Sequence, residues 1–430
     1  MIPNQATSTL RVAFYCARYP DQEMLTTPMG IASIAAYLDQ RLPRQVETRI
    51  VDAFSELRDF APDIIGVSST SQVFHHARSF IREARASFPQ VKIILGGYHI
   101  TAAPQTLPIE CCAGVLGEGE ETTRELVESL LLGHVDDERL VSIPGLALRI
   151  GDKIVTTQPR PLIQDLNVLP DPVRHRNYGP DTPIMTSRGC PYRCSFCASP
   201  GFWQQKVRWR TAESVVTEIN RLVATIRPKS IAILDDLWMA NKPRFRAIVD
   251  GLIESGVPKS VSFRGFCRSN IIHEEDILLM RKMNYRVVRF GAETGSSEHL
   301  RRLKGPGISI EDHQRVIDLC AKHGMRCTAS FMFGAPGETM EDIEQTVAFL
   351  IKNRGKFGIA GFYLFNPIPG TALWDNLESR QLISSDFDLS SLSLDMKSKD
   401  FNWTDPPYFN GDNVPWPAFR AAMLAIGKRF

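Results

Sequence analysis

The chain has little net charge of either sign and carries no charged tail. Its 430 residues include 50 Lys and Arg against 48 Asp and Glu, which gives a formal net charge of +2. Proteins that bind nucleic acid usually show a basic patch, stripe or tail, and none stands out here. We therefore expect no nucleic-acid partner.

The sequence also lacks segments that direct a protein into a membrane. Residues 1–10 are polar and do not have the basic-then-apolar layout of a signal peptide. No apolar run approaches the roughly 20 residues that span a bilayer. Nine cysteines, an odd number, fit a reducing compartment better than a disulfide framework. We expect a cytoplasmic protein with no membrane span.

The length and the 43% hydrophobic content provide enough material for two cores. We predict a first domain over residues 1–150, a proline-rich linker over 151–182, a second domain over 183–375 and a C-terminal tail over 376–430. The tail holds aromatic residues between 401 and 416 that could form a lid over a site or a strap packed on the second domain.

Both domains show strands alternating with helices. Such alternation predicts α/β folds with parallel sheets, and short runs that are apolar throughout predict strands buried on both faces. In the first domain the predicted strands are 11–16, 46–51, 63–68, 91–95 and 114–116, followed by a hairpin around Gly151-Asp152. In the second domain they are 183–187, 230–234, 261–266, 287–292, 328–333 and 359–365, which predicts a partial (β/α)6 barrel.

One loop carries the strongest chemical signal. Cys190, Cys194 and Cys197 follow the first strand of the second domain. A cubane iron–sulfur cluster normally uses four thiolates, so a tight group of three indicates a cluster with one open iron. That iron could hold the amino and carboxylate groups of S-adenosylmethionine and pass an electron to its sulfonium. The alternative is a structural zinc site with Cys267 or a histidine as fourth ligand.

The spacing of Cys190, Cys194, Phe196 and Cys197 resembles the cluster loop of radical S-adenosylmethionine (SAM) enzymes. The flanking segments resemble the subgroup with an N-terminal cobalamin-binding domain, over roughly residues 10 to 375. The resemblance implies a doubly wound, Rossmann- or flavodoxin-like cobalamin (B12) domain before a partial radical SAM barrel. It also implies three cofactors: a [4Fe-4S] cluster, SAM and cobalamin.

The resemblance implies a SAM site at the carboxyl ends of the barrel strands, where such barrels place catalytic residues. Phe196 would contact the adenine. Either of the two neighbouring aspartates after the second strand, with an arginine and a glutamate, would hold the amino acid and ribose parts. A structural ion pair is the alternative for the arginine and the glutamate. The residues concerned, with the predicted nucleoside wall last, are Asp235, Asp236, Arg268, Glu293, Gly334 and Pro336.

Four loops at the corresponding edge of the first domain are rich in Gly, Ser or Thr, and ligands of doubly wound sheets bind at this edge. The resemblance implies that they hold cobalamin through Ser68, Ser69, Thr70, Gly96, Gly97, Tyr98, His99, Gly117, Glu118 and Gly119. An Asp-x-His-x-x-Gly motif, whose histidine would bind cobalt from below, is absent after the first strand. The lower ligand is therefore unassigned, and a histidine after a double glycine is more often a hydrogen-bonding residue.

The activity implied by the resemblance is methylation of an unactivated carbon by way of a 5′-deoxyadenosyl radical and methylcobalamin. The substrate would be a small molecule or natural product, and a flavodoxin or ferredoxin would donate electrons. One alternative is a radical SAM cyclase, oxidase or rearrangement enzyme that transfers no methyl group. The other is a zinc-stabilised ligand-binding protein.

Overall fold

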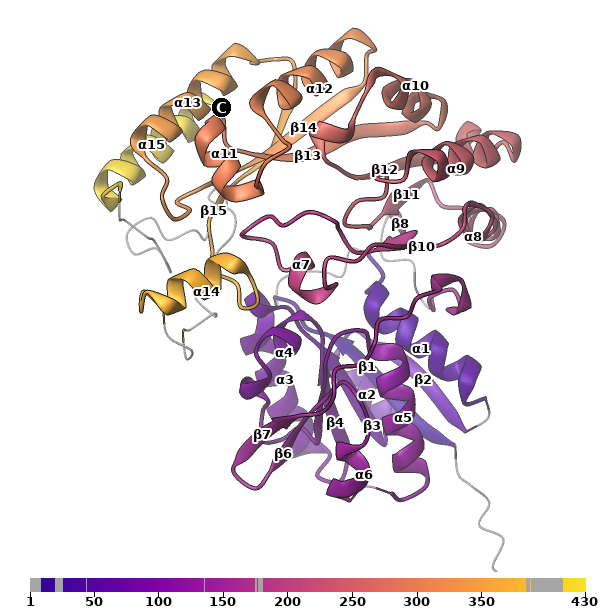
Figure 1. Cartoon of the computed structure of the whole chain (residues 1–430). Helices are drawn as coiled ribbons and strands as arrows, with labels where there is room; N and C mark the ends of the chain where they lie inside the picture. Colours follow the sequence, from indigo (N-terminus) through magenta and orange to yellow (C-terminus); the bar gives the residue numbers. More distant parts are fainter. Residues whose placement is uncertain are drawn as a thin grey trace, which may run out of the picture. The chain divides into compact units, whose positions relative to one another are not determined.

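The computed structural model describes residues 9–19, 26–43, 45–134, 136–174, 176, 181–383, 387 and 413–430. Residues 1–8, the second half of the loop after the first strand and most of the aromatic tail lie outside the described residues. The chain divides into two compact units, Met1–Gly179 and Pro180–Phe430 (Figure 1).

A seven-stranded sheet forms the centre of the first unit, in the order β2-β1-β3-β4-β5-β6-β7. The first five strands pair in parallel in the flavodoxin-like order 2-1-3-4-5, which confirms the predicted doubly wound sheet. The predicted hairpin is also confirmed, and it extends the sheet with two antiparallel strands. The strands are β1 Leu10–Cys16, β2 Val46–Val51, β3 Ile64–Ser68, β4 Lys92–Gly96, β5 Ala113–Val115, β6 Leu146–Ile150 and β7 Lys153–Thr156.

Two hydrophobic cores cover the two faces of this sheet. Successive strand residues point to opposite faces, so Ile64 joins one core while Ile65 joins the other. Helices α1 and α5 pack on the face of Ile64, and α2 and α3 on the face of Ile65. The helices are α1 Met29–Arg41, α2 Phe54–Phe60, η1 Ser71–Val73, α3 Phe74–Ser87, α4 Tyr98–Ala102, η2 Pro104–Thr106, α5 Gly119–Leu131, α6 Asp137–Val141 and η3 Leu166–Val168.

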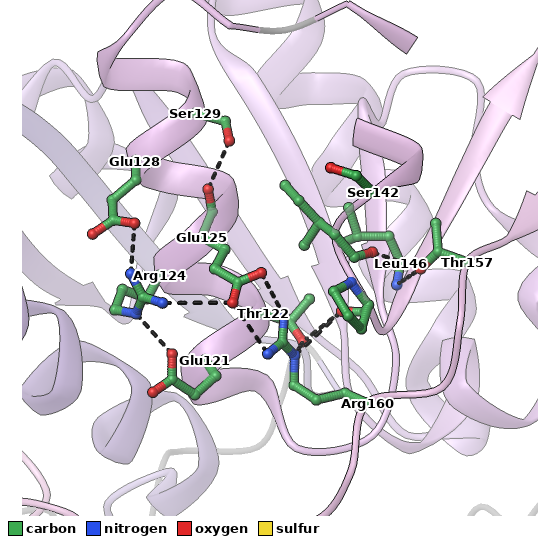
Figure 2. Close-up of polar contacts among 12 residues, drawn as sticks. Glu121, Thr122, Arg124, Glu125, Glu128, Ser129, Ser142, Leu146, Thr157 and Arg160 are labelled. Carbon is green, nitrogen blue, oxygen red and sulfur yellow. Dashed lines mark hydrogen bonds and ion pairs between the residues drawn. The ribbon is translucent and has the colours of Figure 1, made fainter. Parts of the chain in front are cut away.

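The chain that follows the hairpin is anchored to helix α5 (Figure 2). Arg160 donates hydrogen bonds to the Thr122 hydroxyl at 2.7 Å and to the Glu125 carboxylate at 2.8 Å. On the same helix Arg124 bridges Glu121 and Glu128, which lie about one turn before and one turn after it. These contacts fix the start of α5, which follows directly on the Gly117 loop.

The second unit is built on six parallel strands in the order β15-β14-β13-β12-β11-β8. Strands adjacent in this sheet are consecutive in the chain apart from two short strands, β9 and β10, which pair separately. This is the predicted partial barrel of six strand–helix units. Its strands are β8 Asp181–Ile184, β9 Ser187–Arg188, β10 Arg208–Trp209, β11 Ser230–Ile233, β12 Ser262–Cys267, β13 Tyr285–Glu293, β14 Arg326–Phe333 and β15 Gly358–Leu364.

Helices cover the outer face of this sheet around one hydrophobic core that includes the fully buried Trp238, Phe263 and Phe331. The helices are α7 Ser199–Phe202, α8 Ala212–Thr225, α9 Lys242–Glu254, η4 Val257–Lys259, η5 Ser269–Ile271, α10 Glu274–Lys282, α11 Ser297–Lys304, α12 Ile310–Lys322, α13 Met340–Lys352, α14 Ala372–Ser379 and α15 Trp416–Arg429. In the described part of the chain, no helix is long and apolar enough to cross a membrane.

Candidate functional site

The three cysteines of the predicted cluster loop lie between β9 and α7, beyond the carboxyl end of β8. All three are free thiols and are partly exposed. Burial raises the pKa of the Cys190 thiol, and it raises that of Cys197 to about 11; the negative charges of Asp236 and Cys194 add to both shifts. A bound cation would favour the thiolate forms.

Backbone contacts hold this loop against the rest of the unit. The Ser195 N–H donates to the Leu303 carbonyl at 2.8 Å, and the Ser195 carbonyl accepts from the Leu373 N–H at 2.9 Å. Gly189, directly before the first cysteine, has a φ of +101°. A Cβ at Gly189 would overlap the backbone oxygen of Lys206, so the approach to the loop requires glycine.

Cys267, the residue considered as a fourth zinc ligand, does not join the loop. Its thiol is buried 3.7 Å from the Met239 sulfur and 3.9 Å from the Tyr285 hydroxyl. No group of three or more His, Cys, Asp and Glu side chains in the described residues is arranged to hold a single metal ion.

Arg268 lies against the cluster loop. Its Nη1 donates to the Cys194 Sγ at 3.2 Å, and its guanidinium carbon lies 3.8 Å from the centre of the Tyr192 ring. The side chain is only 7% exposed. The predicted SAM ligand Arg268 thus contacts a predicted cluster ligand directly.

The two aspartates after β11 point in different directions. Asp235 is buried, and its carboxylate accepts from the Thr186 N–H at 2.6 Å and from the hydroxyls of Thr186 and Ser187 at 2.5 Å. Asp236 is exposed, and burial together with its charge raises the pKa of the Cys190 and Cys197 thiols. Of the two, Asp236 is therefore the one that reaches the cluster loop.

Glu293 ends β13 with a left-handed backbone, at a φ of +65°. Its carboxylate pairs with the buried Lys304 ammonium at 2.9 Å, and Lys304 also donates to the Gly291 carbonyl at 2.5 Å. The ion pair weighed for Glu293 is present, but its cation is Lys304 and not Arg268. A non-glycine residue in this conformation is strained, and such strain is concentrated at functional sites.

The glycine-rich turn after β14 is held from within. Gly334 has a φ of +78°, and its N–H donates to the Glu338 carboxyl at 2.5 Å. Burial raises the pKa of Glu338 to about 8, and the buried His299 ring lies 3.8 Å away. Pro336 in this turn stays partly exposed. Phe196 packs against the hydrophobic cluster that contains Met332, Ala335 and Phe365.

In the first unit, the residues predicted to contact cobalamin divide by exposure. All lie at the carboxyl ends of β3 and β4 or shortly after β3, β4 and β5. Ser68, Thr70, Gly96, Gly97, Tyr98 and Gly117 keep accessible surface, whereas Ser69, His99, Glu118 and Gly119 are buried. Glu118 accepts from the Ile163 N–H at 2.8 Å, so this carboxylate anchors the later chain.

Both ring nitrogens of His99 form hydrogen bonds within the protein. Its Nδ1 lies 3.1 Å from the Ser71 hydroxyl and its Nε2 3.0 Å from the Thr106 hydroxyl, while the ring stacks on Phe74. Burial lowers the pKa of His99 to about 4, so the ring is neutral. Binding a metal through either nitrogen would break a buried hydrogen bond. The structure thus agrees with the hydrogen-bonding role expected for this histidine.

Tyr192 and Lys304 lie at this site although the sequence analysis did not select them. Tyr192 lies between the first two cysteines in the sequence, so its position could have identified it as a residue of the site. Lys304 ends helix α11, and nothing in its local sequence marks it.

Two family models match the chain, one in each unit. The model described as the B12 binding domain matches residues 23–127, and that of the radical SAM superfamily matches residues 184–350. The uncharacterized methyltransferase PH0819 of Pyrococcus horikoshii is 30% identical over 377 residues, covering 83% of this chain and 79% of the relative. The chain belongs to the cobalamin-binding radical SAM family.

Two further proteins are similar to this chain over most of its length. The anaerobic magnesium-protoporphyrin IX monomethyl ester cyclase of Cereibacter sphaeroides is 26% identical over 76% of this chain, which spans 55% of that relative's length. The radical SAM methyltransferase TsrM from Kitasatospora setae, solved with cobalamin and a [4Fe-4S] cluster, matches with a TM-score of 0.72 and 20% identity, covering 87% of this chain and 75% of TsrM. At that identity the likeness to TsrM shows a shared fold.

Membership of this radical SAM family carries three cofactors: a [4Fe-4S] cluster, SAM and cobalamin. The residues present fit them. Three free, partly exposed thiols lie on one loop that requires glycine at its start, and a buried cation donates to one of them. In the first unit, Gly117 has a φ of +71°, and a Cβ built on it would meet no other atom within 4 Å, which leaves backbone open to a ligand.

Proposed function

We propose that this radical SAM enzyme methylates an unactivated carbon of a small-molecule substrate. The observation that carries the proposal is the cluster loop: three free thiols at the carboxyl end of the first barrel strand, with Arg268 donating to the middle one. The methyltransferase PH0819, 30% identical over most of both chains, supports methyl transfer as the outcome. When bound, the cluster and SAM supply a carbon radical, and cobalamin supplies the methyl group.

The residues of the chain would hold and shield these groups. Cys190, Cys194 and Cys197 would ligate three irons of the cluster and leave the fourth for SAM. Asp236 and Glu293 would meet the charged parts of SAM, as the family resemblance implies. Phe196, and the turn of Gly334 and Pro336, would form the apolar wall for the nucleoside, as the family resemblance implies.

In the first unit, the accessible loop residues would hold cobalamin by backbone and hydroxyl contacts. His99 would support these loops from behind. The reducing compartment that nine free thiols favour would be the cytoplasm, with a flavodoxin or ferredoxin as the electron donor.

A single substitution tests the cluster assignment. In anaerobically loaded enzyme, Cys194→Ala should lose 5′-deoxyadenosine formation and most of its iron and sulfide, because one of three ligands is removed. Cys267→Ala is the matched control, since this buried thiol faces Met239 and Tyr285 and not the loop. Unchanged SAM cleavage in Cys194→Ala, or equal iron loss in Cys267→Ala, contradicts the assignment.

A cyclase or other radical reaction without methyl transfer is the second candidate, because the cyclase of Cereibacter sphaeroides is also a relative. The mass of the product separates the two. A gain of one methylene unit indicates methylation, and a loss of hydrogen at constant carbon count indicates oxidative ring closure.

A further inference from the structure

Arg268 differs from Lys304, a second buried cation at this site. Lys304 is neutralised by the Glu293 carboxylate at 2.9 Å. Among the residues that the structure describes, no carboxylate forms an ion pair with Arg268; its donors reach the Cys194 sulfur at 3.2 Å and the Lys304 carbonyl at 3.5 Å. A buried charge without a counter-ion is costly, which indicates that negative charge at the sulfur balances this guanidinium.

Tyr192 fixes the guanidinium in this position. The ring lies 3.8 Å from the guanidinium carbon, well within the range of cation–π contacts. The Tyr192 hydroxyl accepts from Asn270 Nδ2 at 3.2 Å, and Asn270 Nδ2 also donates to the Gly307 carbonyl at 2.8 Å. A chain of contacts thus runs from the loop at Gly307 through Asn270 and the aromatic ring to the donor on the sulfur.

The reduction potential of an iron–sulfur cluster depends on the net charge around it and on hydrogen bonds to its sulfurs. Reduction by an external one-electron donor adds one negative charge and breaks no bond in the protein. A fixed cation that donates to a ligand sulfur stabilises the reduced form more than the oxidised form, because the reduced form is more negative.

We infer that Arg268, held by Tyr192, is a positioning residue that raises the reduction potential of the cluster by donating to the Cys194 sulfur. This inference rests on the proposed function, since it needs a cluster on the loop. It gives Arg268 a role toward the cluster in place of the SAM contact expected from the sequence.

The test is an anaerobic potentiometric titration of the loaded full-length protein, followed by electron paramagnetic resonance of the reduced cluster. Arg268→Gln should lower the equilibrium constant for one-electron reduction about tenfold or more, which is about 59 mV for each factor of ten. Tyr192→Leu should shift the potential in the same direction by less. Tyr192→Phe keeps the ring and should leave the potential near that of the parent.

Arg246→Gln is the charge-matched control, because Arg246 is exposed on α9 and pairs with Glu275 away from the loop. The inference is overturned if Arg268→Gln and Tyr192→Leu have the same reduction potential as Arg246→Gln. That result would leave the proposed function intact. If Arg268→Gln binds no cluster, the reduction potentials of Tyr192→Leu and Tyr192→Phe are compared instead, and equal potentials overturn the inference. A parent protein that forms no cluster overturns both proposals.

Discussion

At the scale of single residues, the space around Gly189 controls the geometry of the cluster loop. This glycine combines a left-handed backbone with a Lys206 carbonyl oxygen that would overlap a Cβ at this position, so it cannot carry a side chain unless one of the two segments moves. The next residue is Cys190. A shift here would therefore displace the first cysteine of the loop.

We therefore expect Gly189→Ala to lose iron and sulfide loading and to unfold at lower urea concentration than the parent. Gly256→Ala is the matched control: it has a φ of +73° but nothing within 4 Å of a built Cβ, so it bears only the conformational cost of about 1–2 kcal/mol. Iron analysis and urea titration measure both effects. Equal behaviour of the two variants would show that the contact with Lys206 does not matter.

The contacts of single residues at the site could not be predicted from the sequence. Asp235 and Asp236 are adjacent and both polar, so no pattern told which one reaches the loop; the structure separates them because neighbouring residues at a strand end point to opposite sides. Arg268 and Glu293 could be predicted as site residues from their strand-end positions. Their partners could not, because Cys194 and Lys304 are brought to them by tertiary packing.

At the scale of elements, the turn from β14 into α13 depends on a buried carboxyl. Glu338 accepts from the Gly334 N–H, and burial raises its pKa from 4.5 to about 8. The folded state thus keeps a proton that the unfolded chain loses near pH 4.5. The contribution of this retained proton to the free energy of unfolding is therefore fully present below pH 4.5. It is lost progressively as the pH rises to about 8.

Glu338→Gln should remove this pH dependence while keeping an acceptor for Gly334. His299 lies beside Glu338, and burial lowers the pKa of its ring from 6.5 to about 4, which gives the opposite slope below pH 6.5. Between pH 6.5 and 8, therefore, only Glu338 of these two groups changes the stability. As the pH rises across this range, the free energy of unfolding should fall by about 2 kcal/mol more in the parent than in Glu338→Gln, at about 1.4 kcal/mol per pKa unit.

Urea unfolding at several pH values within this window measures the difference. Glu344→Gln, at an exposed position on α13 after this turn, should follow the parent. Parallel profiles for the parent and Glu338→Gln would mean that Glu338 is already ionised in the folded protein.

Element prediction succeeded most clearly where a strand is short and apolar on both faces. Short apolar segments such as β3 and β11 have few interpretations other than buried strands. Their alternation with helices then predicts parallel pairing. Helices α2 and α11 were not predicted. Each is eight residues or fewer, so too few turns are present for a periodic signal to stand out.

At the scale of the whole molecule, two cofactor-binding units are joined in one chain. Their order, a flavodoxin-like unit before a six-stranded parallel unit, could be predicted from the sequence and is confirmed by the fold and by the two family models. The substrate could not be predicted, since substrate recognition depends on side chains from several loops and not on a local motif.

The most direct test of this organisation is metal analysis with an absorption spectrum, on full-length protein produced anaerobically with cobalamin supplied. We predict about four irons and four sulfides per chain for one cubane cluster. Corrin absorption bands and stoichiometric cobalt should accompany them in the same preparation. Zinc in place of iron and sulfide, or a cluster without corrin after repeated loading, would contradict the assignment of two cofactor-binding units.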